Sequence, residues 1–414
     1  MSKNSKLKIG IFNDTFPPIL DGVGSVTRNY AYWLNREAGQ VTVVTPRVPD
    51  YTDNEEFQVL RFLSVPLPGN KPFRWGFPWL DPCFNRCLSR LQFDIIHAHS
   101  PFVTGRIGLK VRQKLDLPMV ASFHSKYRDD LERIVPEPIS FFVQSYVNRI
   151  AWFYNATDEV WIPNRSTEET LREYGYTGPI QVVENATDIV APPDLAPLQQ
   201  SLNERHALTN GKKVFLYIGQ HIWEKNHRTL LEALKILKEK YLSDYMMLFI
   251  GMGYAAKQME RLSRKIGLEN EVKFIGPVND REELKKYYAR ADLFVFPSLY
   301  DTSPLTLRES AAFRLPTLLI KNSTASEHVT DEVNGFLSEN DPESLARRIF
   351  DASRNRDLLQ SVGENAKKSF HRTWKEVADE VNERYREIIA RHAVARHSAR
   401  PEAERGTQAG SGAR

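Results

Sequence analysis

The sequence predicts an α/β fold with two domains, each built on a parallel β-sheet with helices on both faces. Short apolar runs alternate with helical patterns in both halves of the chain, which is typical of doubly wound, Rossmann-like sheets. A proline-rich segment, Ala191-Pro-Pro-Asp-Leu-Ala-Pro197, interrupts regular structure between the halves. The length of 414 residues also exceeds what one ordinary hydrophobic core organises. We therefore expect a functional cleft between the domains, facing the carboxyl edges of both sheets.

The first domain is predicted to span residues 1–190. Its buried strands are the apolar runs Leu7–Phe12, Val41–Thr45, Asp94–His97, Met119–Phe123, Val160–Pro163 and Gln181–Val183. Helical patterns separate most of these strands, for example Ser25–Leu34, Arg106–Leu115 and Ile139–Tyr154. The pattern over Ile139–Tyr154 repeats large apolar residues at the helical period.

The second domain is predicted to span residues 198–372. Its strands are Val214–Ile218, Met246–Ile250, Val272–Ile275, Leu293–Phe296 and Thr317–Ile320. Its helices include Arg228–Lys238, Arg281–Ala289 and Pro304–Phe313, the last with Ser303 as its cap and Pro304 at its first position. A final helix within 373–395 is expected to return to the first domain. The polar tail 398–414 has the composition of a disordered segment.

Composition excludes several classes of protein. A content of 41% hydrophobic and 26% charged residues is that of a soluble globular protein. A net charge of +4 argues against a dedicated nucleic-acid binder. Cys83 and Cys87 form neither a four-ligand zinc site nor a C-x-x-C motif, and they suit a reducing cytoplasm. No run approaches the roughly 18 apolar residues of a spanning helix, and Met1–Lys8 has no signal-peptide core, so we expect a cytoplasmic protein.

The segment Asp301-Thr-Ser-Pro-Leu-Thr-Leu-Arg-Glu309 carries two carboxylates across a predicted loop-to-helix turn. Asp301 would lie in the loop after a strand, and Glu309 about a turn and a half into the helix. Between them are backbone N–H groups that no helical carbonyl satisfies, which favours binding of an anionic phosphate. The pattern therefore suits chemistry on a nucleoside diphosphate. The alternative is a solvated loop acid and a glutamate on a helix surface.

Three further loops follow predicted strands. Asp21-Gly-Val-Gly24 allows close approach of backbone to a ligand, although a purely structural turn has the same glycines. Gly219-Gln-His-Ile-Trp-Glu-Lys-Asn226 carries Lys225, whose compact ammonium suits developing phosphate charge. His124, at the end of the strand Met119–Phe123, is able to hydrogen-bond a sugar hydroxyl or an acceptor. The nearby His97 and His99 are interpreted as packing residues at strand ends, with acceptor contact as the alternative.

Taken together, these motifs resemble those of the family-4 retaining glycosyltransferases, which have the two-domain GT-B fold. Glu309-Ser-Ala-Ala-Phe-Arg-Leu-Pro matches the second half of that family's paired-acid motif, whereas Asp301 stands where the first acid is usually Glu. The loop Gly219–Asn226 resembles the family's diphosphate loop, but Gln220 occupies the position of its arginine. Either His221 or another cation would compensate for the missing charge, or the leaving group would be held less strongly. Asn185 and Asp188 resemble the family's hinge segment.

The resemblance implies roles for individual residues. The implied catalytic residues are His124, Asp301, Glu309 and Lys225. The implied donor-binding residues are Gly22, Gly24, Gly219, Gln220, Lys225, Val278, Ser303, Pro304, Leu305, Thr306 and Glu309. His124, Tyr127 and Arg128 are implied on the acceptor side. Glu309 would hold the ribose hydroxyls, and the backbone of the segment that ends at Val278 would read the base.

The expected activity is that of a retaining hexosyltransferase with a nucleotide-sugar donor, UDP-glucose being favoured. No D-x-D motif occurs, so neutralisation falls to Lys225 and helix amides, and no metal or other cofactor is expected. Alternatives are a nucleotide-sugar epimerase and a non-catalytic binder of the same fold. The oligomeric state stays open.

The favoured acceptor is a membrane glycolipid precursor such as diacylglycerol, with a polysaccharide or soluble acceptor as the alternative. Between Lys71 and Lys114 there are eight basic residues against two acidic ones, so this segment carries +6 while the whole chain carries +4. The segment also contains Trp75 and Trp79, which suit an anionic membrane surface. Phe123-His-Ser-Lys-Tyr127 is similar to a segment of diacylglycerol glucosyltransferases. Peripheral attachment to the inner face of the cell membrane is therefore expected, unless the aromatics pack beneath a loop.

Overall fold

The computed structural model describes residues 5–19, 21–67, 73–128, 141–209, 211–299 and 301–398. The chain divides into two compact units. Unit 1 comprises residues 1–184 and 374–414, and unit 2 comprises residues 185–373. Each unit is considered by itself below. The predictions that fall on Met1–Asn4, Lys71, Ile139–Ser140 and residues 399–414 lie outside the described residues.

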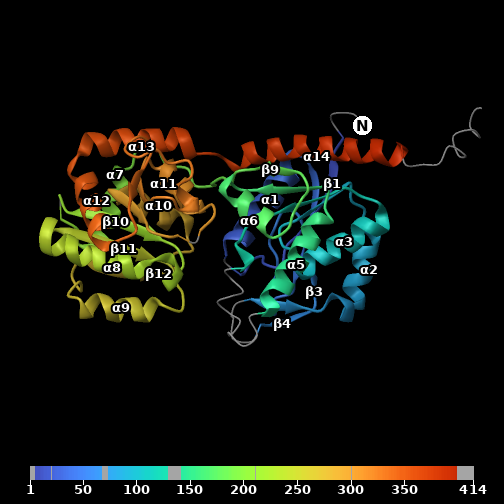
Figure 1. The fold of residues 1–414 in the computed structure, drawn as a ribbon, viewed down its shortest axis with the longest axis horizontal. Helices are drawn as coiled ribbons and strands as arrows, with labels where there is room; N and C mark the ends of the chain where they lie inside the picture. Colours follow the sequence, from blue (N-terminus) through green and yellow to red (C-terminus); the bar gives the residue numbers. More distant parts are fainter. Residues whose placement is uncertain are drawn as a thin grey trace, which may run out of the picture. The chain divides into compact units, whose positions relative to one another are not determined.

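Unit 1 is built around a parallel sheet with the strand order β3-β2-β1-β6-β7-β8-β9 in its described part (Figure 1). The strands of this sheet are β1 (Leu7–Phe12), β2 (Gly39–Pro46), β3 (Gln58–Phe62), β6 (Ile95–Ala98), β7 (Met119–Ser122), β8 (Glu159–Ile162) and β9 (Ile180–Val182). A separate antiparallel pair is formed by β4 (Ser64–Pro66) and β5 (Arg74–Gly76). The helices are α1 (Gly22–Glu37), η1 (Pro78–Leu80), α2 (Pro82–Arg90), α3 (Val103–Leu115), α5 (Phe141–Asn155), α6 (Ser166–Glu173) and α14 (Trp374–Ser398).

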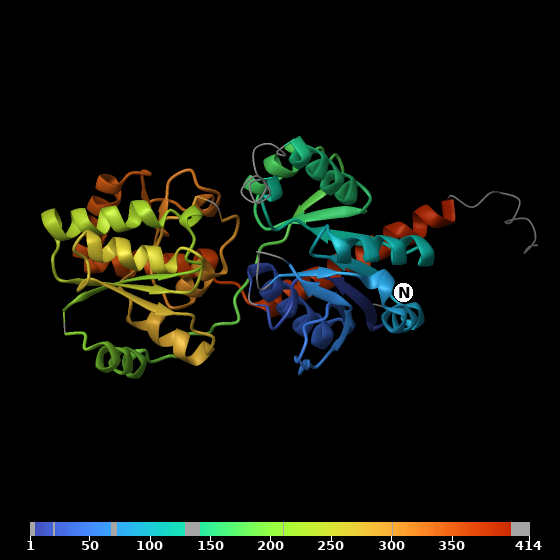
Figure 2. The ribbon, with the colours of Figure 1, turned by 90° about the horizontal axis from the view of Figure 1, so that it is seen from below.

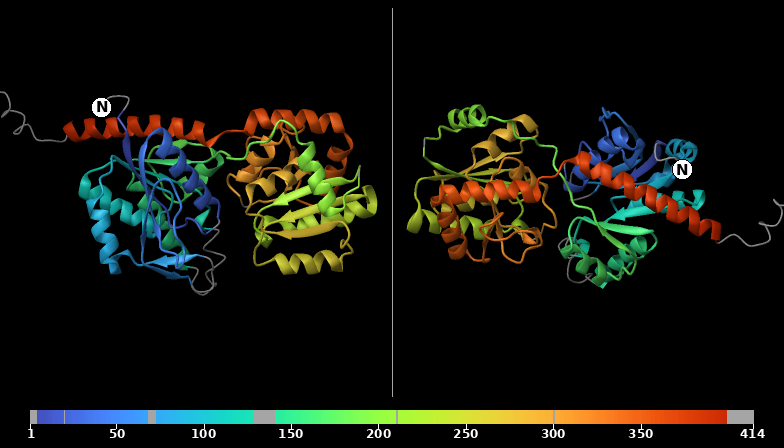
Figure 3. Two further views of the ribbon diagram at one scale, coloured as in Figure 1. Left: turned by 180° about the vertical axis from the view of Figure 1, so that it is seen from behind. Right: turned by 90° about the horizontal axis from the view of Figure 1, so that it is seen from above.

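The last helix, α14, belongs to unit 1 although 189 residues of unit 2 separate it from β9 in the chain. It runs along unit 1 beside α1 in both views of Figure 3, and its first residue, Trp374, packs edge-on against Tyr30 of α1 with ring centroids 5.6 Å apart. Further along α14, Tyr385 stacks on Trp161 of β8. Both Trp374 and Tyr385 are buried, so apolar contacts hold the helix on the sheet.

Unit 2 contains a second parallel sheet, with the order β12-β11-β10-β13-β14-β15 among its described strands. These strands are β10 (Lys213–Ile218), β11 (Tyr245–Ile250), β12 (Val272–Gly276), β13 (Leu293–Phe296), β14 (Thr317–Ile320) and β15 (Phe336–Ser338). The helices are α7 (Ala196–His206), η3 (Trp223–Lys225), α8 (His227–Ile236), the π-helical turn η4 (Leu237–Tyr241), α9 (Ala256–Lys265), α10 (Arg281–Arg290), α11 (Leu305–Ala312), η5 (Thr324–Ser326), α12 (Pro342–Arg354) and α13 (Arg356–Phe370).

Helices cover both faces of the unit 2 sheet, as Figure 2 shows. α8 packs with α12, and α7 packs with α10. Right-handed crossovers explain this division, because the chain moves outward from β10 to β12 and then returns to the other side of β10. The central strands are consequently buried on both faces and read as continuous apolar runs, such as the Tyr245–Ile250 strand.

The strand order reverses once in each sheet. In unit 1 the reversal lies between β1 and β6, and in unit 2 between β10 and β13. Loops leaving two neighbouring strands in opposite directions open a crevice at the carboxyl edge, where doubly wound sheets bind ligands. The reversals therefore mark the two places where a functional site is expected on structural grounds.

Several boundaries differ from those expected. The units divide at Glu184, before the prolines, because Thr187 already pairs with Arg372 and Thr373 of unit 2. Helix α11 begins at Leu305, and its cap is Pro304 and not Ser303, since Pro304 has an extended ψ of 126°. The final helix continues to Ser398, which the sequence placed in the tail.

Four strands were not predicted. The edge strands β3 and β15 and the small β4–β5 pair are short, and most residues of β3, β4 and β5 are partly buried or exposed. Their sequences consequently lack the long apolar run by which the central strands are recognised.

Candidate functional site

Lys225 and Asp301 meet at the strand reversal of unit 2. Lys225 ends η3, which follows β10, and Asp301 lies in the loop after β13. Because β10 and β13 are neighbouring parallel strands, both loops leave the same edge of the sheet. The Lys225 ammonium forms an ion pair with the Asp301 carboxylate, and it lies 5.8 Å from the centre of the Phe296 ring. Both side chains are largely buried, so the pair is a charged centre shielded from bulk water.

The β10 loop is held through its backbone. The Gln220 carbonyl accepts hydrogen bonds from His227 Nε2 at 3.1 Å and from the Tyr217 hydroxyl at 3.2 Å. On the other side, a Cβ atom at Gly251 would lie 1.9 Å from the Gly219 carbonyl oxygen, so only glycine permits this approach of the two loops. The Gln220 side chain itself is exposed. Two buried aromatic donors and one glycine thus fix the loop that carries Lys225.

His221 does not supply the charge that Gln220 lacks. Its side chain is buried against Phe249 and Phe274, and this burial lowers its pKa to about 4. The imidazole is therefore neutral at pH 7. A neutral His221 leaves the other two options, which are another cation or a leaving group that is held less strongly.

Glu309 is surrounded by polar partners in the interior of unit 2. Its Oε2 accepts a hydrogen bond of 2.5 Å from the Tyr288 hydroxyl, and its Oε1 lies 3.0 Å from the Arg281 guanidinium. Arg281 also forms an ion pair with Asp188, and these two carboxylates contribute to raising the pKa of Arg281 above its ordinary value. Arg281, Asp188 and Glu309 thus form one charge network that keeps the Glu309 carboxylate oriented.

Several buried polar atoms at this edge have no partner among the described residues. They are the Oδ2 of Asp301, the Oγ1 of Thr306, the Nε2 of His221 and the Nδ1 of His227. Leaving such atoms unpaired costs about 1–3 kcal/mol each, so natural structures keep few of them without a ligand or water. Their gathering on the loops after β10 and β13 indicates a place where a polar ligand binds.

The remaining predicted donor-side residues lie in the same unit, except for two glycines. Ser303 accepts a hydrogen bond of 3.4 Å from Asn185 through its carbonyl, and Val278 packs partly against the core in the loop after β12. Gly22 and Gly24 instead open α1 in unit 1. The Gly24 amide donates to the Asp21 carboxylate at 2.7 Å, so this N–H already serves the cap of its own helix.

In unit 1, His124 follows β7 and lies beside His99, which follows β6. The two rings are joined by a hydrogen bond of 3.0 Å between His99 Nδ1 and His124 Nε2. Burial lowers the pKa of His124 to about 4 and that of His99 well below its ordinary value. His97 is fully buried between the Tyr385 hydroxyl and Ser122, as expected for a packing residue.

The other two acceptor-side candidates are turned toward protein. Tyr127 is buried, and its hydroxyl lies 3.3 Å from that of Tyr154. The Arg128 guanidinium donates to Gln144 at 3.1 Å. Of the three acceptor-side candidates, His124 is therefore the one that we consider further.

The structure adds residues that the sequence analysis did not single out. Arg281 and Tyr288 contact Glu309, and Asn340 accepts a hydrogen bond of 2.8 Å from Asn226 beside Lys225. At the reversal of unit 1, Asp14 accepts hydrogen bonds from Ser100 and Thr104 and so caps α3. Asn13 and Asp14 are polar residues directly after β1, so the sequence could have indicated Asp14 as a candidate at the carboxyl edge. Nothing in the sequence indicates that Tyr288 contacts Glu309.

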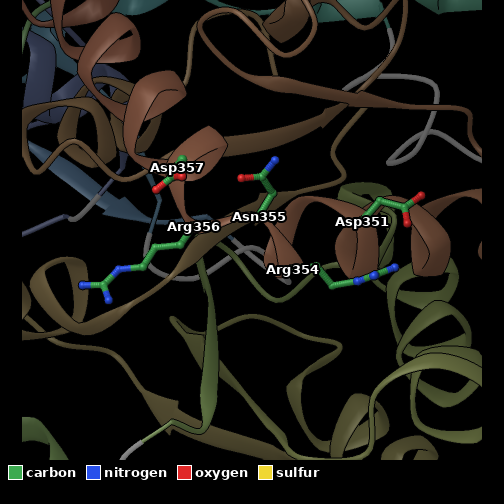
Figure 4. Close-up of a pocket in the computed structure, with 5 residues that line it drawn as sticks. All are labelled: Asp351, Arg354, Asn355, Arg356 and Asp357. Atoms are coloured by element: carbon green, nitrogen blue, oxygen red, sulfur yellow. The ribbon is translucent and has the colours of Figure 1, made fainter.

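A separate depression at the turn between α12 and α13 carries no site. Figure 4 shows its five residues, whose side chains point in different directions. They are Asp351, Arg354, Asn355, Arg356 and Asp357, which are two acidic, two basic and one neutral residue. The turn ends a helix that returns from the carboxyl edge, away from Lys225 and Glu309.

In the described ranges, no three His, Cys, Asp or Glu side chains lie close enough to hold a metal ion. No described helix is long and apolar enough to span a bilayer.

Acid should destabilise the protein through its buried histidines. Burial lowers the pKa of His227 to about 4, so between pH 6.5 and 4 the unfolded chain binds a proton that the folded chain does not. The free energy of unfolding then falls with decreasing pH by about 1.4 kcal/mol per pH unit for each such group. Urea titrations at pH 7 and pH 5 should show a smaller loss for His227→Gln than for the wild type. Asp21, whose pKa burial raises to about 6, acts in the opposite direction and cancels in this comparison.

Comparison with known proteins identifies the family of the chain. A family model described as Glycosyltransferase Family 4 matches residues 20–190, and one described as Glycosyl transferases group 1 matches residues 199–369. The alpha-monoglucosyldiacylglycerol synthase of Streptococcus pneumoniae is 24% identical over 341 residues, which cover 80% of this chain and 75% of that protein. The GDP-mannose-dependent alpha-mannosyltransferase of Corynebacterium glutamicum is 23% identical, with 93% and 90% covered.

Among solved structures, HepE of Anabaena in complex with UDP-glucose superposes with a TM-score of 0.70 at 18% identity. The match covers 93% of this chain and 99% of that one. At this identity the likeness concerns the fold. Since the two family models together match residues 20–190 and 199–369, the chain belongs to glycosyltransferase family 4 and is a hexosyltransferase with the GT-B fold of two Rossmann-like domains.

Proposed function

We propose that this protein transfers glucose, with retention of anomeric configuration, from UDP-glucose to a membrane lipid of the diacylglycerol type. The observation that carries the donor side is the buried Lys225–Asp301 pair at the strand reversal of unit 2. Buried polar atoms of Asp301, Thr306, His221 and His227 have no partner among the described residues. Lys225 would contact the diphosphate, and the Oδ2 of Asp301 would accept a hydroxyl of the donor sugar. Glu309, oriented by Arg281 and Tyr288, would accept the ribose hydroxyls.

The charge of Lys225 should stabilise the transition state more than the ground state. A diphosphate that reaches Lys225 competes with the Asp301 carboxylate for the same ammonium. As the leaving group departs, its charge grows, so the attraction to Lys225 is stronger in the transition state than in the ground state. Interactions that strengthen in this way lower the barrier.

The donor identity is supported by HepE, which binds UDP-glucose, whereas the Corynebacterium relative is named for GDP-mannose.

Transfer should not depend on a divalent metal ion. We propose that Lys225 and the amides at the start of α11 neutralise the leaving diphosphate, since the chain contains no D-x-D motif. Initial rates measured with excess EDTA should equal those in buffer alone, and added Mg²⁺ or Mn²⁺ should leave them unchanged. Complete inhibition by EDTA that manganese reverses would contradict this mechanism.

The lipid acceptor is favoured by an aromatic patch on unit 1. Trp75 and Trp79 expose 54% and 63% of their surfaces, and Leu80 exposes 62%. Phe77 joins the two tryptophans, since its ring lies 6.0 Å from Trp75 and 5.4 Å from Trp79. These residues, which lie on β5, on η1 and between the two, form what we call the aromatic patch. Tryptophan prefers the interfacial zone of a bilayer, so this patch suits insertion at the headgroup level.

The positive charge of the surrounding segment is less concentrated than its sequence suggests. Arg86 and Arg90 are exposed on α2, directly after η1. Arg112, however, forms an ion pair with Asp158, and Arg74 donates to Ser64 within the hairpin. Phe84 is buried in the core, whereas Trp75 and Trp79 are exposed. Some aromatic residues of the segment thus pack inside the protein and others are exposed. Only the exposed residues support membrane binding.

Binding to anionic vesicles should depend on the aromatic patch. At low salt the protein should sediment with phosphatidylglycerol vesicles, and the double variant Trp75→Ala/Trp79→Ala should bind at least tenfold more weakly. Trp152→Ala is the matched control, because Trp152 is 61% exposed on α5 of the same unit but lies outside the patch. High salt should weaken binding further, since each nearby cation contributes about 1 kcal/mol. Equal binding by both variants, or no binding at all at low salt, would favour a soluble acceptor.

The transfer reaction itself tests the proposal. Purified protein is incubated with UDP-glucose or GDP-mannose, and with diacylglycerol in anionic vesicles, a soluble glycan or no acceptor. We expect UDP release and an alpha-linked glucosyl lipid, identified by its NMR coupling, in the first combination. Product formation with soluble glycans only would exclude the lipid acceptor, and a preference for GDP-mannose would exclude the proposed donor.

A further inference from the structure

The hydrogen bond between His99 and His124 is close to linear and lies in the planes of both rings. The ring planes differ by only 10°, and the centroids are 5.3 Å apart. The distance between Nδ1 of His99 and Nε2 of His124 is 3.0 Å. The rest of the centroid separation equals the sum of the two distances from a ring centroid to its nitrogen. The two nitrogens therefore lie close to the line between the rings, in both planes. In this position an N–H on one ring points at the lone pair of the other.

His99 is enclosed by aromatic rings. Its imidazole stacks on His97 with centroids 4.1 Å apart, and Tyr30 packs edge-on against it at 5.1 Å. The residue is 1% exposed, and its Nε2 is buried without a hydrogen-bond partner in the described part of the chain. Burial lowers the pKa of His99 well below its ordinary value, so the ring is neutral at pH 7 and carries a single proton.

That single proton has two places to go. If it sat on Nε2 of His99, a buried N–H would lack an acceptor, and such orphaned donors are rare in folded proteins. If it sits on Nδ1, it is donated to His124 and only a bare ring nitrogen is left unpaired. The second arrangement satisfies the donor, and it requires His124 to accept through Nε2.

We propose that His99 is a positioning residue that holds His124 in the tautomer whose proton is on Nδ1. Histidine in water favours the other tautomer, with the proton on Nε2. The lone pair of His124 Nε2 is committed to His99, so this nitrogen does not act as a base. Resting on the function proposed above, His124 then acts through Nδ1, as a hydrogen-bond donor and not as a base.

Two substitutions at His99 separate this role from packing. His99→Leu removes the donor and keeps an apolar side chain of similar reach. His99→Asn places an amide N–H at the position of Nδ1 and restores the donor. The chain has ten histidines, so selective ¹⁵N labelling gives a spectrum in which His124→Gln identifies the His124 signals. We expect these signals to report the Nδ1–H tautomer in the wild type and in His99→Asn. In His99→Leu they should shift to the Nε2–H tautomer.

Activity provides the second readout. His99→Leu should lower kcat about tenfold while the Kd for UDP stays within twofold, since the nucleotide contacts are proposed on unit 2, and His99→Asn should recover most of the rate. Thermal melting identifies a variant that fails to fold, in which case His99→Asn and the wild-type spectrum decide the question. An Nε2–H signal for His124 in the wild type would overturn the proposal. So would an unchanged tautomer in folded His99→Leu. The spectra require no turnover, so they stand even if the proposed donor or acceptor is wrong.

Discussion

Replacing Lys225 by alanine is expected to lower kcat/KM for the nucleotide-sugar donor by a factor of about 30 to 1,000, on the order of 2–4 kcal/mol. The ammonium is buried beside Asp301 at the strand reversal, where water screens it poorly. Its loss removes the charge that we assign to the leaving diphosphate. Steady-state rates with UDP-glucose, and UDP affinity by calorimetry, measure the two consequences separately.

Two controls accompany Lys225→Ala. Lys238→Ala removes a lysine of the same unit that is paired with Glu271 at 3.0 Å, outside the candidate site, and should leave the rate close to that of the wild type. Lys225→Ala also leaves the Asp301 carboxylate without its partner, which lowers stability. The double variant Lys225→Ala/Asp301→Asn should regain stability without regaining activity. Wild-type turnover by folded Lys225→Ala would remove this lysine from the mechanism.

Substitution of Glu309 by alanine is expected to weaken UDP binding by a factor of about 150 or more, which corresponds to about 3 kcal/mol. Hydrogen bonds to a charged group contribute about 1.5–3 kcal/mol each, and we assign two ribose hydroxyls to this carboxylate. Arg281 would then face Asp188 alone, and the Tyr288 hydroxyl would lose its acceptor. Calorimetric titration with UDP measures the loss directly.

Intermediate substitutions divide the Glu309 effect into its parts. Glu309→Gln keeps an acceptor for Tyr288 but not the charge beside Arg281, so it should fall between alanine and the wild type. Tyr288→Phe should reduce UDP affinity only severalfold, because it removes orientation and not the carboxylate. Glu271→Gln, at a buried acid paired with Lys238, is the matched control. If Glu309→Ala bound UDP as tightly as Glu271→Gln does, the ribose assignment would be wrong.

The sequence by itself determined the fold class and the central strands of both sheets. The run Leu293–Phe296 was predicted residue for residue, because a strand buried on both faces must be apolar along its whole length. Edge strands such as β3 and β15 escaped prediction for the complementary reason. They bury fewer residues, so fewer of their positions have to be apolar.

The sequence also placed Lys225, Asp301 and Glu309 at the ends of strands or the starts of helices, since loops after parallel strands gather at one edge. It did not determine which side chains would be partners. That Arg281 and Tyr288 hold Glu309, and that His99 meets His124, follows from strand order and helix crossing, which bring together residues 21 to 28 positions apart. Charge states were decided at the same level. His221 was a plausible cation by residue type, but enclosure by Phe249 and Phe274 removes its proton, and only tertiary packing creates that enclosure.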